Sequence, residues 1–211
     1  MAEENAFFRK EKQSSYALKM SILRWACYGP RRLLASERND NFLIAATKND
    51  AAAVFAYASD PEVTRYLAFP THQSIAAAET FLAACADWWE SGREFCWLIT
   101  LKDSGDVIGS IGCRFGGHGP DIGYVLAKGH WGRGYMTEAA QAMVAWVKSR
   151  PNVHRIWAFC DLENTASTRV MEKLGMTREG VLRKWFPSPN LSPVPRDCFV
   201  YAWVRPDPAR G

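Results

Sequence analysis

The sequence lacks the features that mark membrane-spanning and exported proteins. Its 211 residues contain no apolar run that approaches the roughly 18 residues needed to cross a bilayer. The N-terminus begins Met-Ala-Glu-Glu, which is acidic and leads into no apolar segment of the kind that a secretory signal requires. We therefore expect no membrane partner, and the sequence predicts a cytoplasmic protein.

Clustered cysteines are absent as well. The six cysteines are scattered along the chain, without a Cys-x-x-Cys pair or a nearby group of histidines. A structural zinc site needs such a cluster, and a disulfide framework is typical of short secreted chains. We therefore expect no metal. The thiols are predicted to be reduced and mostly buried, at Cys27, Cys85, Cys96, Cys113, Cys160 and Cys198.

The chain has no dense basic run, although its net charge is +4. Residues 1–38 hold eight Lys or Arg against four Asp or Glu, so this segment carries the whole net charge. A basic extension could contact nucleic acid, a ribosome or a membrane surface. The interspersed acids favour a solvated arm, so no nucleic-acid partner is expected. We divide the chain into a basic N-terminal extension, 1–38, and one folded domain, 39–211.

What is present is an alternation between helical and strand periodicity. Polar or Gly-containing turns separate the segments, and Asn or Gly stands where a helix should begin or end. This order of elements predicts a mixed α/β sheet with helices on both faces. Strands are predicted at 42–46, 95–101, 107–113, 121–127, 154–160, 177–184 and 197–204, and helices at 49–59, 74–91, 134–150 and 164–174.

The most informative stretch runs from Ile122 to Ala139, where a strand passes through a Gly-rich loop into a helix. The first amides of a helix lack intrahelical acceptors, and the helix dipole is positive there, so this end attracts anions. Gly132 and Gly134 allow close approach of a bulky polyanion. The order Gly129-x-x-Gly132-x-Gly134 matches neither a P-loop nor a dinucleotide fingerprint. Taken alone, it is equally compatible with a plain strand-to-helix connection.

Seven motifs together resemble the GNAT superfamily of acetyltransferases, and within it the RimJ/RimL-like branch of ribosomal-protein N-terminal acetyltransferases. They occur in family order between about residues 39 and 205. The resemblance implies a single GNAT-like domain whose roughly seven-stranded sheet is splayed at its centre, with acetyl-CoA in the split. The motifs are Ser59–Tyr66, Val107–Gly112, Ile122–Leu126, Trp131–Ala139, Asn164-x-x-Ser167, Glu172–Gly175 and Arg196–Tyr201.

The resemblance also implies which residues hold acetyl-CoA. The pyrophosphate is expected on the amides of the Gly-rich loop and helix start, and the pantetheine arm along the open edge of the preceding strand. One face of the next helix is expected to look at the pantetheine and the sulfur. The implied residues are Tyr124, Val125, Leu126, Trp131, Gly132, Arg133, Gly134, Tyr135, Met136, Thr137, Asn164, Ser167, Met171 and Lys173.

The predicted chemistry is direct attack of a neutral amine on the thioester carbonyl. The amide N–H of Leu126, or one beside it, is expected to stabilise the developing oxyanion. Ser167 is the candidate donor of a proton to the departing thiolate, and Asn164 is a helix cap, a catalytic contact, or both.

No general base stands out from the sequence. Some related enzymes use a Glu on the preceding strand and a Tyr on the helix, and those places hold Phe159 and Met171 here. Asp121 and Glu138 are nearby acids. Each has a simple structural explanation, as a strand-end charge and as a first-turn carboxylate, respectively.

The missing base favours a weakly basic acceptor. An α-amino group has a pKa of about 7.7–8.0, against about 10.4 for lysine, so far more of it is neutral at pH 7. The predicted acceptor is therefore a primary amine that is weakly basic, with the N-terminal α-amine of a protein as the favoured example. A small-molecule amine (antibiotic, polyamine or amino acid) and a non-catalytic acyl-CoA-binding module stay open as alternatives.

The acceptor pocket is expected between residues 64–72 and 185–196, with Trp185, Phe186 and four prolines as a rigid apolar wall. Few acids occur in these two loops, which counts against a polycationic acceptor. Trp88 and Trp89 are expected in the core, because their helix needs a buried face. The oligomeric state stays open, although homodimers are common among similar proteins.

Overall fold

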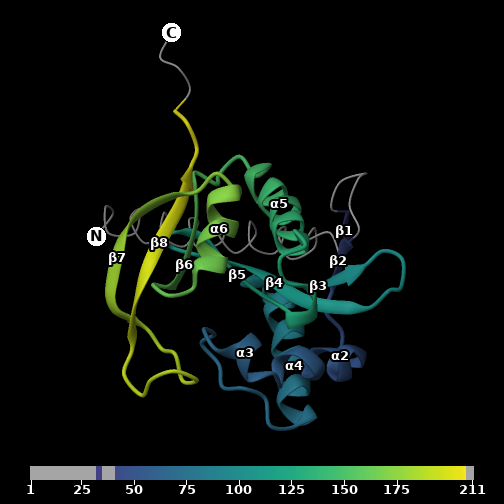
Figure 1. Ribbon diagram of the computed structural model, residues 1–211. Helices are drawn as coiled ribbons and strands as arrows, with labels where there is room; N and C mark the ends of the chain where they lie inside the picture. Colours follow the sequence, from purple (N-terminus) through teal and green to yellow (C-terminus); the bar gives the residue numbers. More distant parts are fainter. Residues whose placement is uncertain (1–31, 35–40, 208–211) are drawn as a thin grey trace, which may run out of the picture.

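The computed structural model describes residues 32–34 and 41–207, which build one mixed sheet between two layers of helices (Figure 1). The strand order is β1-β2-β3-β4-β5-β6-β8-β7. Neighbouring strands are antiparallel except for β5 and β6, which are parallel. The strands are β1 (Arg32–Leu34), β2 (Asn41–Ala45), β3 (Glu94–Leu101), β4 (Val107–Gly116), β5 (Gly119–Leu126), β6 (Arg155–Asp161), β7 (Thr177–Phe186) and β8 (Arg196–Val204).

Helices cover both faces of the sheet, as Figure 1 shows. α2 (Ala51–Ala58), α3 (Pro61–Thr64) and α4 (Ile75–Ser91) form the first layer. α5 (Tyr135–Lys148) joins the parallel strands β5 and β6, and α6 (Thr165–Lys173) lies beside it in the second layer. This arrangement confirms the predicted mixed α/β fold.

All seven predicted strands and the four predicted helices are present, with ends that differ by a few residues. The short helix α3 was not predicted, because Asp60-Pro61 directly follows the predicted helix 49–59 and a proline there is typical of a helix end. The Asp60 side chain accepts a hydrogen bond from the Glu62 amide at 2.8 Å, and Pro61 has the fixed φ that suits a first helical position. The same dipeptide therefore ends one helix and begins the next.

The strand β1 extends the sheet into the segment predicted as an N-terminal extension. It pairs with β2 in antiparallel register, with Arg32 opposite Ile44. Residues 1–31 and 35–40, and with them most of the predicted basic extension and Cys27, lie outside the described part of the chain.

Alternation along β3 divides the core between the two faces. Phe95, Trp97 and Ile99 point toward α5, whereas Leu98 packs with α2 and α4. Trp89 meets Trp97 edge-to-face at 5.3 Å between ring centroids, so its predicted core position is confirmed. The five described cysteines are free and buried, as expected. Within the described residues, no helix combines the length and apolarity that a membrane crossing requires.

The sheet opens at its centre, between β5 and β6. Among the described residues these strands pair only where Asp121 lies opposite Trp157. At this closed end the Trp157 indole donates to the Gly119 carbonyl at 3.2 Å. A Cβ on Gly119, whose φ is +91°, would lie 2.7 Å from the Arg155 carbonyl oxygen, so glycine permits this approach. Beyond it the strands diverge, which confirms the predicted splay.

Candidate active site

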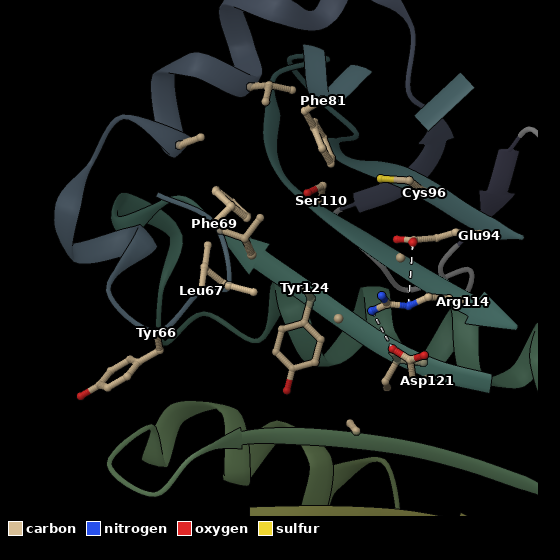
Figure 2. Close-up of a pocket in the computed structure, with 18 of the residues that line it drawn as sticks. Tyr66, Leu67, Phe69, Phe81, Glu94, Cys96, Ser110, Arg114, Asp121 and Tyr124 are labelled. Atoms are coloured by element: carbon tan, nitrogen blue, oxygen red, sulfur yellow. Dashed lines mark hydrogen bonds and ion pairs between the residues drawn. The ribbon is translucent and has the colours of Figure 1, made fainter. Parts of the chain in front are cut away.

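A cavity of about 580 Å³ lies between the sheet and the α2–α4 layer, and it reaches residues on both sides of the β5–β6 gap. Figure 2 shows labelled residues from several elements around it, with Phe69, Phe81 and Leu67 directed into it and Tyr66 directed away. Three small residues lie in register across β3, β4 and β5 and form its floor: Cys96, Gly112 and Gly123. The walls are mostly apolar and come from α2, α4 and the α3–α4 loop: Val54, Ala58, Leu67, Phe69, Phe81 and Trp88.

Trp88 corrects a prediction, because it lines this cavity instead of the core. Successive residues of a helix are separated by about 100°, so Trp89 can face the core while Trp88 faces away from it. The Arg93 guanidinium lies over the Trp88 ring, 5.4 Å from its centroid. The hydrophobic pattern of α4 could not tell a core-facing side chain from a cavity-facing one.

The register of β4 and β5 decides which backbone groups face the gap. Ala127 donates from its amide to the Ile108 carbonyl at 2.8 Å, and hydrogen-bonded pairs alternate along an antiparallel ladder. The amides of Tyr124 and Leu126 therefore point away from β4, toward β6, whereas that of Val125 points to β4. The Leu126 carbonyl accepts from the Trp131 indole at 2.7 Å, which ties the Gly-rich loop to the strand edge.

The start of α5 presents unbonded amides in an open setting. Gly134 caps the helix with φ of 89°, Gly132 has φ of 74°, and the first helical bond runs from the Glu138 amide to the Gly134 carbonyl. A Cβ on either glycine would meet nothing within 4 Å. Trp131 and Arg133 are exposed, and Tyr135 and Thr137 are half-buried. Met136 has its side chain buried in the core, which leaves its amide for a ligand.

The N-terminal half of α6 borders the cavity. The Asn164 side chain accepts from the Ser167 amide at 3.1 Å, so Asn164 is a helix cap as well as a lining residue. Lower down the helix, Met171 is fully buried in the core and Lys173 is exposed at the end. The Met171 side chain therefore does not line the cavity, although it shares a helical face with Ser167.

Tyr124 bridges the gap from β5 to α6. Its hydroxyl lies 2.8 Å from the Ser167 hydroxyl and also donates to the Ser167 carbonyl at 3.2 Å. Burial raises the pKa of Tyr124, against a smaller opposing effect of the Ser167 hydrogen bond. Tyr124 therefore remains a neutral hydroxyl donor at physiological pH.

The start of α6 is held in place by a buried carboxylate. Asp161 at the end of β6 accepts from the Glu163 amide at 3.0 Å, and the Arg196 guanidinium of β8 donates to both of its oxygens. Burial would raise the pKa of Asp161, but these hydrogen bonds and the charge of Arg196 outweigh burial and lower it. The ion pair thus fixes the turn that carries Asn164 and Ser167.

Three charged residues in the cavity were not recognised together from the sequence. Glu94, Arg114 and Asp121 lie directly opposite one another across β3, β4 and β5, as the dashed lines in Figure 2 show. Arg114 contacts Asp121 at 3.0 Å and Glu94 at 4.0 Å. Burial is the main cause that raises the pKa of each acid, and Arg114 opposes it. Glu138, the other acid considered, instead accepts from the Asn41 amide at 3.4 Å.

Hydrogen bonds of Asn190 link the two loops that were expected to shape the acceptor pocket. Its amide nitrogen donates to the carbonyls of Thr64 at 2.7 Å and Phe69 at 2.9 Å. Its oxygen accepts from the Thr71 amide and hydroxyl at 2.9 and 3.2 Å. The α3–α4 loop is thereby held against the β7–β8 loop.

The predicted apolar wall is present only in part. Phe186 is buried, lines the cavity and packs against Phe159 with 5.0 Å between ring centroids. Trp185 is 54% exposed and does not line it, because consecutive strand residues face opposite sides. The four prolines border a separate pocket between the β7–β8 loop and Ala68 and Pro70 of the α3–α4 loop.

A parallel strand pair that opens beside a Gly-rich helix start is the arrangement that the GNAT resemblance implies, and sequence comparison decides the family. The acetyltransferase (GNAT) domain profile matches residues 42–177. The uncharacterized N-acetyltransferase YoaA of Bacillus subtilis (strain 168) is 32% identical over 163 residues, which cover 76% of this chain and 90% of YoaA. The chain belongs to the GNAT acetyltransferases.

Solved structures agree with this assignment. The crystal structure of a GNAT acetyltransferase from Bacillus anthracis superposes with a TM-score of 0.69 at 30% identity, over 82% of this chain and 98% of that one. RimL, the ribosomal L7/L12 α-N-protein acetyltransferase, in complex with coenzyme A gives a TM-score of 0.72 at 19% identity, over 82% and 98% of the two chains. At that identity RimL supports the fold alone. The protein is an N-acetyltransferase, and its family implies an acetyl acceptor.

Proposed function

We propose that this GNAT protein transfers the acetyl group of acetyl-CoA to the α-amine of a peptide or protein. The observation that carries the proposal is the cavity, which brings an apolar acceptor side and the Tyr124–Ser167 pair together at the β5–β6 gap. An amine that enters from the α2–α4 side would meet an acetyl group held at the edge of β5.

Two features of the chain fit acetyl-CoA. The amides from Gly132 to Thr137 have no acceptor among the described residues and lie at the positive end of α5, and the two glycines leave space there, which suits a pyrophosphate. The edge of β5 offers the amides of Tyr124 and Leu126, which suit the peptide-like pantetheine arm. Acetyl-CoA supplies an activated acetyl thioester. Arg133, exposed in the loop, can add a charge-assisted contact to a phosphate.

The residues at the gap have distinct roles in the proposed transfer. The Leu126 N–H would donate to the acetyl oxygen as negative charge develops, an interaction worth roughly 3–4 kcal/mol in comparable sites. The hydrogen-bonded hydroxyls of Ser167 and Tyr124 would deliver a proton to the departing sulfur. Asn164 caps α6 through the Ser167 amide, so it orients the helix end that carries Ser167.

The acceptor has to arrive largely deprotonated. Asp121 is three residues from Tyr124 along β5, a separation of about 10 Å, so a proton reaches it only through water. A peptide α-amine needs less help than a lysine, because its pKa is lower by about 2–3 units. The two acids in the cavity lining, Glu94 and Asp121, favour a second candidate acceptor, which is a small amine with more than one positive charge.

Matched peptides test the choice of acceptor. One peptide carries a free Ala or Ser α-amine and no lysine, and its counterpart has a blocked α-amine and a single lysine. We expect faster release of coenzyme A with the first, and mass spectrometry should place the acetyl group on its N-terminus. Faster acetylation of the lysine peptide or of a free polyamine would overturn the α-amine assignment. Saturable binding of acetyl-CoA without transfer to any amine would leave only an acyl-CoA-binding module.

A further inference from the structure

The charged row Glu94–Arg114–Asp121 carries more negative than positive charge, at one end of the cavity. One guanidinium stands between two carboxylates, so the row has a formal charge of −1 when both acids are ionised. The side chains of Glu94 and Asp121 are 20% and 14% exposed, whereas that of Arg114 is 56% exposed. The acids are therefore held in the cavity wall, and the arginine is the member with room to move.

The two acids also differ in their contact with Arg114, because only Asp121 accepts a hydrogen bond from it. Arg114 donates to Asp121 at 3.0 Å, but its contact with Glu94 is 4.0 Å long, which is an ion pair without a hydrogen bond. Arg93, which lies over the Trp88 ring, acts on Glu94 through its charge alone. Half-buried carboxylates that are not fully neutralised raise each other's cost of ionisation. A cation that entered the cavity would offset this cost, and Glu94 has the free capacity to accept its hydrogen bonds.

A second polar group on the floor indicates that the occupant is not purely apolar. Tyr57 on α2 is 4% exposed and lines the cavity, and the polar neighbour of its hydroxyl is Ser110, to which it makes no hydrogen bond of full geometry. Ser110, on the same floor, is 6% exposed. A ligand that carries a polar group in its chain would complete the hydrogen bonding of these buried hydroxyls.

The row is separated from the transfer site by a fixed distance. Along β5, the backbone of Asp121 lies about 10 Å from that of Tyr124 and about 17 Å from that of Leu126. The Asp121 side chain shares the cavity face with Gly123 and with Gly112 beside it, whereas Tyr124 leaves the other face at the β5–β6 gap. A Cβ on Gly123 would meet nothing within 4 Å, so this part of the floor is open. An extended chain can run along it from one end to the other.

We propose that Glu94 and Asp121 form a cation subsite, and that the acceptor is a primary amine with a second positively charged group roughly 10–17 Å from the reacting nitrogen, the span from Asp121 to Tyr124 and to Leu126 along β5. The inference rests on the proposed function, since it assumes that the acceptor occupies this cavity. The apolar walls would contact the linking chain, and Tyr57 would bond to a polar group within it. Peptides with a basic side chain near the N-terminus and linear diamines share this chemistry.

The test compares acceptors that differ only in the second charge. Diaminooctane is compared with octylamine, and a peptide with lysine near its N-terminus is compared with its norleucine counterpart. The readout is the ratio of kcat/KM within each pair. We expect a preference of about tenfold for the dication in at least one pair, from one charge-assisted contact. The pair that shows it identifies the source, a small diamine or a basic peptide.

Three variants separate a cation subsite from a structural role. Glu94→Gln should reduce the ratio toward one, and Asp121→Asn should do the same. Arg114→Gln removes the competing cation and should increase the ratio, which a merely structural ion-pair network would not do. Glu90→Gln, an exposed acid on α4 outside the cavity, is the matched control and should keep the wild-type ratio.

The outcomes are distinguishable. Efficient transfer to octylamine and norleucine peptides without any preference for a second charge would overturn the cation subsite and leave the transferase proposal intact. A preference that persists in Glu94→Gln, or that falls in Arg114→Gln, would overturn it as well. Failure to transfer to any of the amines would overturn both proposals.

Discussion

The place of the Leu126 amide depends on a glycine in the neighbouring strand. Gly109 of β4 lies opposite Leu126 of β5, and a Cβ built on it would lie 2.3 Å from the Val125 carbonyl oxygen and 3.0 Å from the Leu126 Cα. Ordinary contacts of a Cβ begin at 3.4 Å. In Gly109→Ala, β5 therefore has to move by about 1 Å at its open edge, because both obstacles are backbone.

A shift of this size should reduce the rate of transfer strongly. A misplacement of about 1 Å can cost on the order of 10²-fold in rate when it disturbs the alignment of reacting groups. Crowding of a packed strand should in addition cost about 1–3 kcal/mol of stability. We expect kcat in Gly109→Ala to fall by about 10²-fold at saturating acetyl-CoA, measured by release of free coenzyme A well below the Tm.

The matched control is Gly116→Ala on the same strand. A Cβ on Gly116 meets nothing within 4 Å, so the same substitution should leave kcat within about twofold. Binding of coenzyme A, measured by calorimetry, should weaken much less than kcat in Gly109→Ala, because the amides at the start of α5 are not displaced. A folded Gly109→Ala protein with wild-type kcat would refute the reasoning, and so would an equal loss in Gly116→Ala.

Three further substitutions test other parts of the site. Tyr124→Phe removes the hydroxyl that bonds to Ser167 and should lower kcat about tenfold or more with little change in acetyl-CoA affinity; an unchanged kcat in steady-state assays would exclude a role in proton delivery. Asn190→Ala removes the hydrogen bonds that join the α3–α4 loop to the β7–β8 loop. It should raise the KM of the acceptor amine several-fold and leave the Kd of coenzyme A unchanged, and a larger effect on coenzyme A binding would contradict this role of Asn190. Arg196→Ala leaves the buried Asp161 without its partner and should cost about 3 kcal/mol in denaturant unfolding at pH 7. Because the folded pKa of Asp161 is lowered below 3.8, this deficit should be complete above about pH 4 and disappear as the pH falls through the folded value; a deficit that persists at lower pH would contradict it.

The periodic segments were predictable because their signals are local. The alternation in β3 to β5, the helical spacing of α5 and the caps at Asn164 and Gly92 each depend on neighbours within a few residues, and the structure has these elements close to their expected ends. The short helix α3 was missed because a proline stop and a proline start look alike in sequence.

The functional residues that could be predicted are likewise those that stand in local motifs. The Gly-rich loop, Asn164 and Ser167 stand in ordered motifs, so a resemblance could point to them. Trp88 could not be assigned to the cavity, since a tryptophan next to another on an amphipathic helix fits the core equally well.

The sequence by itself determined the order of strands and helices, the glycines that open the start of α5 and membership of the GNAT family. Each of these depends on residues that are neighbours in the chain or that belong to a short motif. Only the tertiary structure decided that Glu94, Arg114 and Asp121 meet in one row, and that Tyr124 reaches Ser167 across the gap. These groups come from separate strands and a helix. Their distances follow from strand register and from the divergence of β5 and β6, which no local pattern encodes.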